Sequence, residues 1–179
     1  MSEERDRQEL RRIGGKLVYS GPIASVRMDR FEYPDGSTSI RQVVVHPGAV
    51  GIVAHDGRVL YMVRQPREAV GEAALLELPA GKLDVEGESP LECAQRELAE
   101  EIGKSAGDWR FLKRFYTSPG FASEQIHLFM ATELYDAERQ GSEERLEIVE
   151  VPLDGLDEAI ERCEDAKSLV GLQMLARLL

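Results

Sequence analysis

The chain has 179 residues, of which 42% are hydrophobic, and its 33 acidic and 22 basic side chains give a formal net charge of −11. This length and apolar content suit one packed domain with a short appended element, and the acidic balance argues against a protein that binds nucleic acid through a basic patch. Two cysteines, Cys93 and Cys163, give no disulfide framework. We expect a cytoplasmic protein with no membrane partner, because no apolar run approaches the roughly 18 residues of a membrane span and the charged N-terminus lacks a signal-peptide pattern.

The first part of the chain predicts a small antiparallel sheet. Residues 1–13 are polar and are expected to be frayed or to form a short helix. β-Branched and apolar residues recur over 16–30 and 37–46, around the sequence Tyr33-Pro34-Asp35-Gly36. This sequence predicts a hairpin turn, since Pro fixes φ and Gly accepts positive φ.

We expect the antiparallel strands of residues 1–46 to be followed by a main domain over 47–179. The predicted strands are 49–54, 59–63, 75–78, 109–116, 125–133 and 146–151, the predicted helices are 89–102, 156–162 and 167–179, and 136–144 is a polar loop. These elements interleave without regular βαβ units. The expected fold class is therefore α+β, with a mixed sheet packed between helices.

The helix predicted near residues 90–102 has clear end signals and one apolar face. Ser89 is the expected N-cap, in a capping box with Glu92, and Gly103 is the expected stop. The apolar positions recur at steps of three and four: Leu91, Ala94, Leu98 and Ile102. This face is expected to dock on a core.

Three carboxylates share the opposite face of this helix: Glu97, Glu100 and Glu101. Like charges at this spacing destabilise a helix by roughly 0.2–0.5 kcal/mol per pair, and we expect no basic residue among them to neutralise them. A hard divalent cation, Mg²⁺ or Mn²⁺, offsets this cost and bridges to substrate phosphates. The alternative is an acidic face that is merely solvated.

The residues around this helix resemble the Nudix box of the Nudix hydrolases. That motif runs Gly, five residues, Glu, seven residues, then Arg-Glu-apolar-x-Glu-Glu-x-Gly-apolar, and the chain follows it from Glu88 to Gly103. It departs at two points, because six residues separate Gly81 from Glu88 and because Lys104 takes the last apolar position. The extra residue falls in an acidic loop, where an insertion costs little. The resemblance implies the α/β/α sandwich of the Nudix fold over about residues 45–179.

The resemblance also implies a metal site and a bracing ion pair. The implied ligands are the backbone carbonyl of Ala80 and the carboxylates of Glu97, Glu100 and Glu101. Glu101 is expected to serve catalysis as well as metal binding. Glu88 and Arg96 would pair and brace the helix without touching the metal.

Flanking segments extend the similarity to the ADP-ribose pyrophosphatases of this family. They are residues 63–67, 76–82 and 118–121, with Pro119 fifteen residues past the end of the box. The likeness implies that Arg67 contacts the substrate, since a guanidinium suits a diphosphate and stacks on a base. Glu124 resembles a substrate-contacting acid. Phe121 either stacks on adenine or packs on the core, as loop aromatics more often do.

The remaining need is a general base for the attacking water. Likeness to these enzymes puts Glu144 nearest the metals, with Glu143 as the next candidate, in the loop before the 146–151 strand. The alternative is a solvated charge run.

The resemblance implies hydrolysis of ADP-ribose to AMP and ribose 5-phosphate by a homodimer formed through the N-terminal strands. Two other functions remain open. The substrate could be another nucleoside diphosphate sugar, such as GDP-mannose, or a dinucleoside polyphosphate. The chain could instead sense ADP-ribose without cleaving it, although such modules usually lose carboxylates of the box, all of which stand here.

Overall fold

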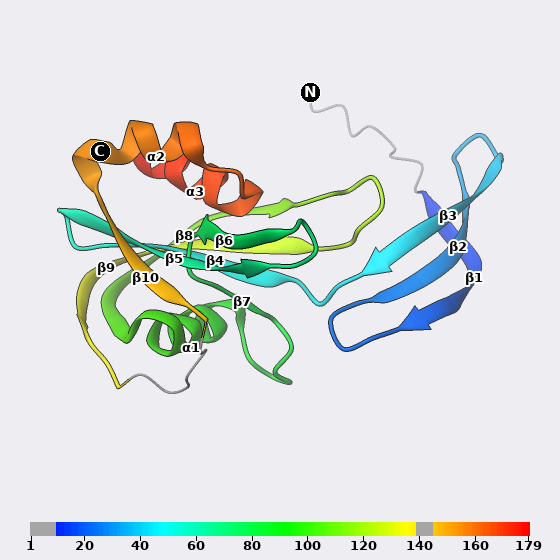
Figure 1. The fold of residues 1–179 in the computed structure, drawn as a ribbon. Coiled ribbons are helices and arrows are strands. Elements are labelled where there is room, and N and C mark those ends of the chain that lie inside the picture. Colours follow the sequence, from blue (N-terminus) through cyan, green and yellow to red (C-terminus); the bar gives the residue numbers. More distant parts are fainter. Residues whose placement is uncertain (1–9, 139–144) are drawn as a thin grey trace, which may run out of the picture. The chain divides into compact units, whose positions relative to one another are not determined.

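The computed structural model describes residues 10–138 and 145–179. The chain divides into two compact units (Figure 1). The first comprises residues up to Pro47 together with Ser118–Glu124, and the second comprises Gly48–Thr117 and Gln125–Leu179. A short segment distant in sequence therefore belongs with the N-terminal strands.

The first unit is a three-stranded antiparallel sheet in the order β1-β2-β3. Its strands are β1 (Arg11–Ser20), β2 (Ser25–Glu32) and β3 (Thr38–Val45). The predicted hairpin turn between β2 and β3 is confirmed. Gly36 N–H donates to the carbonyl of Tyr33 at 2.9 Å, and Gly36 has a φ of 80°, which a side chain would disfavour.

Strand β1 begins earlier than the sequence pattern predicts. Residues 11–13 were expected to be frayed or helical, and this expectation is wrong. Arg11 pairs with Glu32 across the sheet, and Arg12 donates to Asp29 at 2.9 Å. Cross-strand ion pairs stabilise this polar end of the strand, which contains few of the apolar residues that usually identify a strand.

The second unit is built on a seven-stranded sheet, which is mixed, as predicted. Its main path runs β10-β5-β4-β9-β8, while β6 pairs with β5 and β7 pairs with β4. The strands are β4 (Ala49–His55), β5 (Val59–Arg67), β6 (Glu72–Glu77), β7 (Ala80–Lys82), β8 (Lys104–Tyr116), β9 (Gln125–Asp136) and β10 (Glu147–Pro152). Strands β4 and β9 are parallel, and the other pairs are antiparallel.

Helices cover both faces of this sheet (Figure 1). They are α1 (Pro90–Ile102), α2 (Leu156–Arg162) and α3 (Ala166–Ala176), and a short 3-10 turn (Leu153–Gly155) precedes α2. The expected fold class, a mixed sheet packed between helices, is confirmed. Within the described ranges, no helix has the length and apolar character needed to span a membrane.

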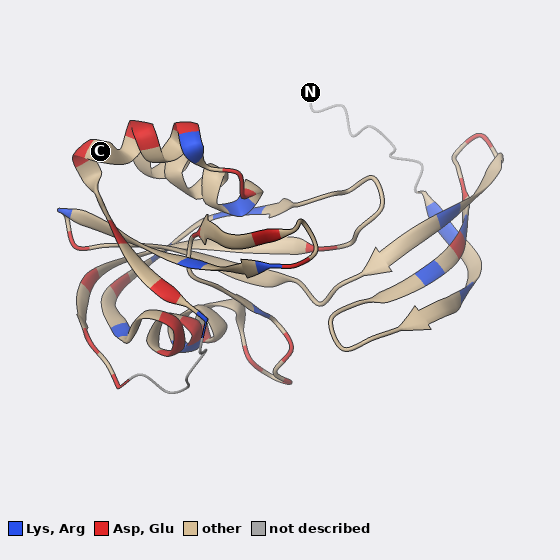
Figure 2. Cartoon of the chain, viewed as in Figure 1, with Lys and Arg blue, Asp and Glu red and all other residues tan. Residues whose placement is uncertain are grey.

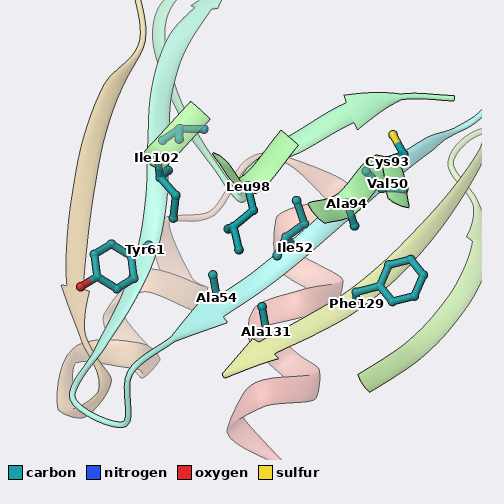
Figure 3. Close-up of a cluster of buried hydrophobic side chains, with 11 residues drawn as sticks. Val50, Ile52, Ala54, Tyr61, Cys93, Ala94, Leu98, Ile102, Phe129 and Ala131 are labelled. Carbon is teal, nitrogen blue, oxygen red and sulfur yellow. The ribbon is translucent and has the colours of Figure 1, made fainter. Parts of the chain in front are cut away.

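Successive residues of β4 point to opposite faces and so supply two cores. Ile52 and Ala54 pack with Leu98 of α1 in one cluster (Figure 3). Val53 packs with Leu172 of α3 in the other. The helix that carries the acidic face is thereby fixed on the sheet by its apolar face.

The ends of α1 are those predicted. Ser89 accepts a hydrogen bond from the Glu92 N–H, and the Glu92 carboxylate accepts one from the Ser89 N–H, which completes the capping box. Gly103 ends the helix with a φ of 66°, a left-handed conformation in which glycine has no Cβ penalty. Cys93 is fully buried in this helix, and burial raises its pKa to about 12, so the thiol stays protonated.

Ser89→Ala is expected to lower the free energy of unfolding by about 1 kcal/mol, since it removes the N-cap acceptor. Urea denaturation monitored by circular dichroism measures this change. Glu92→Gln is the matched control, because an amide oxygen can still accept from the Ser89 N–H. An equal loss in both variants would contradict the assignment of the cap to the serine hydroxyl.

Candidate active site

Arg96 braces the loop that precedes α1. Its Nε donates to Glu88 Oε1 at 2.8 Å and its Nη2 donates to Glu88 Oε2 at 3.0 Å. The hydrogen bond from Arg96 holds the pKa of Glu88 below its ordinary value. The predicted pair is confirmed, and its bidentate form fixes the orientation of the guanidinium as well as its position.

The same guanidinium also reaches the acidic face of α1. Arg96 Nη1 donates to Glu97 Oε1 at 2.7 Å and to Glu100 Oε2 at 2.9 Å. The expectation that no basic residue neutralises these carboxylates is wrong. Arg96 lies four residues before Glu100, which is the spacing at which helical ion pairs form. Part of the repulsion between the carboxylates is thus offset by the protein itself.

Glu101 is the most buried carboxylate of this face, with 5% of the residue exposed. Its Oε2 accepts a hydrogen bond from the Ala80 N–H of β7 at 3.0 Å. The next residue, Gly81, lies so close to Glu97 that a methyl group there would overlap the Glu97 carboxylate. A side chain at residue 81 would have to displace the Glu97 carboxylate, so glycine lets β7 lie against the acidic face with Glu97 in this position. Ala80 lies beside this face through its hydrogen bond to Glu101.

These residues suit a cation that keeps part of its own water shell. The donors are hard oxygens, which Mg²⁺ and Mn²⁺ prefer, and Figure 2 marks the acidic positions of α1 in red on the cartoon. Among the residues that the structure describes, no three acidic, His or Cys side chains converge to enclose an ion. Glu97 and Glu100 also each have one carboxylate oxygen paired with the Arg96 guanidinium. The face therefore fits an ion completed by water and substrate oxygens better than a closed protein cage.

A second charged cluster lies at the end of β6. Glu77 is 1% exposed and accepts two hydrogen bonds from Arg67, Nε to Oε1 at 2.5 Å and Nη2 to Oε2 at 2.7 Å. Lys167 of α3 also contacts the carboxylate. Burial opposes ionisation of Glu77, but the hydrogen bond from Arg67 and the charge of Lys167 outweigh it and lower the pKa.

The start of α3 completes this cluster. Asp165 is the N-cap and accepts hydrogen bonds from the backbone N–H of Ser168 at 2.9 Å, from its hydroxyl at 2.6 Å, and from Lys167 Nζ at 2.9 Å. Ser168, fully buried, accepts from the Leu78 N–H at 2.7 Å. The helix is thus tied to the residues that lead into β7.

The other predicted site residues lie outside this unit or outside the described residues. Phe121 and Glu124 belong to the first unit, where the Phe121 carbonyl accepts from the Val44 N–H at 2.8 Å and Glu124 lies 3.4 Å from His46 Nδ1. Phe121 is 58% exposed, so the expectation that it packs on the core is wrong. Glu143 and Glu144 lie outside the described residues.

The sequence analysis missed Glu77, Lys167 and Ser168 as members of this cluster. The sequence did carry one signal of this cluster, because Glu77 is a charged residue among the leucines of a short predicted strand. A carboxylate buried in such a strand needs a partner. That partner could not be found from spacing, since Lys167 lies 90 residues further along the chain.

Comparisons with known proteins agree with this architecture. A model of the NUDIX domain matches residues 45–170. An ADP-ribose pyrophosphatase of Bacillus subtilis is 38% identical over 174 residues, which cover 93% of this chain and 92% of that protein. A methanol dehydrogenase activator of Bacillus methanolicus is 37% identical over the same length, with the same shares covered.

The structural comparison points the same way. A crystal structure of an ADP compounds hydrolase matches with a TM-score of 0.83 and 26% identity, covering 96% of this chain and 95% of that one. The domain match runs from residue 45 to residue 170 and includes the whole box, from Gly81 to the end of α1. The chain belongs to the Nudix hydrolase family.

Proposed function

We propose that this chain hydrolyses the diphosphate bond of ADP-ribose, so that ADP-ribose and water give AMP and ribose 5-phosphate. The observation that carries the proposal is the acidic face of α1 held against β7, with Glu101 buried at the Ala80 N–H. The substrate comes from the relative named ADP-ribose pyrophosphatase, which matches along almost the whole chain.

Each predicted residue has a role in this proposal. Glu97, Glu100, Glu101 and the carbonyl of Ala80 would hold Mg²⁺ or Mn²⁺, which would supply neutralisation of phosphate charge and activation of a water. Glu144, or Glu143 beside it, accepts the proton of the attacking water. Arg67, Glu124 and Phe121 bind the substrate.

The test is a hydrolysis assay with ADP-ribose, GDP-mannose, other nucleoside diphosphate sugars and dinucleoside polyphosphates, with Mg²⁺ or Mn²⁺ and with EDTA. We expect preferential release of AMP from ADP-ribose and its loss in EDTA. Preference for another nucleotide would change the assigned substrate and leave the proposed metal chemistry in place. Binding of ADP-ribose without turnover of any compound would make the chain a sensor.

We also propose that the chain forms a homodimer through β1. This edge strand is exposed along its whole length, and its apolar side chains include Leu17, Val18 and Tyr19, each more than half exposed. An exposed apolar edge strand favours pairing with another chain.

Leu17→Glu is expected to convert this dimer to a monomer, because it places a charge in the apolar contact. Light scattering coupled to size-exclusion chromatography measures the molar mass. Val70→Glu is the control, since Val70 is also an apolar residue that is more than half exposed, in the turn after β5. A wild-type chain that elutes with the mass of one copy would contradict the proposal.

A further inference from the structure

A single stretch of backbone, residues 77–81, connects the acidic helix to the arginine cluster. The Pro79 carbonyl accepts from the Ile52 N–H at 2.9 Å, and the Ala80 N–H donates to Glu101 at 3.0 Å. Glu77 begins this stretch, three residues before Ala80. A side chain anchored at Glu77 is therefore held by the same hydrogen-bonded segment that carries a proposed metal ligand.

Glu77 accepts hydrogen bonds from one edge of the Arg67 guanidinium and leaves another edge unused. The two hydrogen bonds occupy Nε and Nη2. Within the part of the chain that the structure describes, the Arg67 side chain makes these two hydrogen bonds and no others. Both N–H groups of Nη1 therefore remain for another acceptor. The Arg67 side chain is 41% exposed, whereas that of Glu77 is 1% exposed. The arginine is reachable from solvent and the carboxylate behind it is not.

Arg67 also lies within electrostatic range of the acidic helix. The hydrogen bond to Glu77 is the main cause that raises the pKa of Arg67, and the charge of Glu101 contributes in the same direction. A diphosphate held at Glu101 by a cation would have its oxygens near this guanidinium, and a planar fork suits phosphate oxygens.

We propose that Glu77 is a positioning residue, which acts by holding Arg67 with the edge at Nη1 presented to the diphosphate of the substrate. This inference rests on the proposed function of the site. Because the fork is fixed before binding, less side-chain entropy is lost when the phosphate oxygens arrive. Glu77 itself does not touch the substrate.

A purely structural role for Glu77 makes a different prediction. Lys167 and Glu77 tie α3 to the sheet, and this tie would stabilise the fold whether or not Arg67 were present. Lys167 contacts Glu77 and Asp165 but makes no hydrogen bond to Arg67 among the described residues. Lys167→Met therefore removes the structural tie and leaves the Arg67 fork in place.

The experiment compares the wild type with Glu77→Gln, Lys167→Met, Arg67→Lys and the double variant Arg67→Lys/Glu77→Gln. All are assayed at a temperature below the melting temperature of each variant. It measures KM and kcat for ADP-ribose, and the Kd of the non-hydrolysable α,β-methylene analogue of ADP by calorimetry. Glu77→Gln is expected to raise KM and Kd about tenfold with kcat within about twofold, as for lost uniform binding. Glu77→Gln is expected to have little further effect once Arg67 is Lys.

The outcomes separate this inference from the proposed function. If the wild-type chain does not hydrolyse ADP-ribose, the proposed function is contradicted. The Kd of the ADP analogue, measured by calorimetry, still decides the role of Glu77. Unchanged KM and Kd in Glu77→Gln, or an equal rise in Lys167→Met, would overturn the positioning role. If Glu77→Gln does not fold, Arg67→Lys decides, because it keeps the charge and loses the fork; unchanged KM and Kd there would also overturn it.

Discussion

Glu101→Gln is expected to lower kcat/KM for ADP-ribose by roughly 10²- to 10³-fold, because a bound cation supplies several kcal/mol of transition-state stabilisation and each 1.36 kcal/mol corresponds to tenfold in rate. The substitution keeps the volume of the side chain, and the amide oxygen can still accept from the Ala80 N–H. What is lost is the negative charge at the most buried position of the acidic face. Steady-state kinetics at several Mg²⁺ concentrations measures the effect.

Glu92→Gln is the matched control for this experiment. It makes the same chemical change on the same helix, but Glu92 contacts Ser89 in the capping box and not the acidic face. Its kcat/KM is expected to stay within about twofold of the wild type, as for a surface substitution away from the site. Full activity in Glu101→Gln would show that the carboxylates of α1 do not hold the metal.

Much of the fold could be predicted because local signals and the final structure agree. The bounds of α1 follow from Ser89, Pro90 and Gly103, whose backbone preferences act within one turn of the chain. Strand starts were less accurate. Strand β8 begins at Lys104 and not at residue 109, since its first residues are small or charged and are held by pairing with β9, including the ion pair between Lys104 and Asp136.

In the candidate site, too, features set by local spacing could be predicted and features set by tertiary packing could not. Glu97, Glu100 and Glu101 could be placed on one face from helical spacing alone. The closeness of Gly81 to Glu97 could not, because it depends on how β7 packs against α1. The contacts of Arg96 could not be found from the residues between the carboxylates, because its guanidinium spans a helical turn and donates to Glu97 and Glu100 from one side.

The pairing of Glu77 with Arg67 and Lys167 required the tertiary structure, since three separate elements, β5, β6 and α3, meet there. A buried carboxylate between two cations costs little only while its partners stay in place. Removing one member of such a buried group leaves charge in a low-dielectric setting. This cluster is therefore where a single substitution should cost the fold most.

Glu77→Ala is expected to lower the free energy of unfolding by about 3–5 kcal/mol, the usual cost of breaking a buried ion pair. Lys167→Met should cost less, because Arg67 still neutralises Glu77. Chemical denaturation measures both. Glu158→Ala is the control, since its ion pair with Arg162 on α2 is exposed and such pairs contribute about 0–1 kcal/mol. Equal losses in Glu77→Ala and Glu158→Ala would contradict the buried pairing.

The pH dependence of this difference gives a second, independent measurement. The folded state lowers the pKa of Glu77 below its unfolded value of about 4.3. The stabilisation from its ionised form is therefore fully present above that value and is lost as pH falls through the lower folded pKa. The gap in unfolding free energy between wild type and Glu77→Ala should stay constant from about pH 7 to pH 5 and narrow below about pH 4. A gap that widens on acidification would mean that burial, and not Arg67 and Lys167, dominates the ionisation of Glu77.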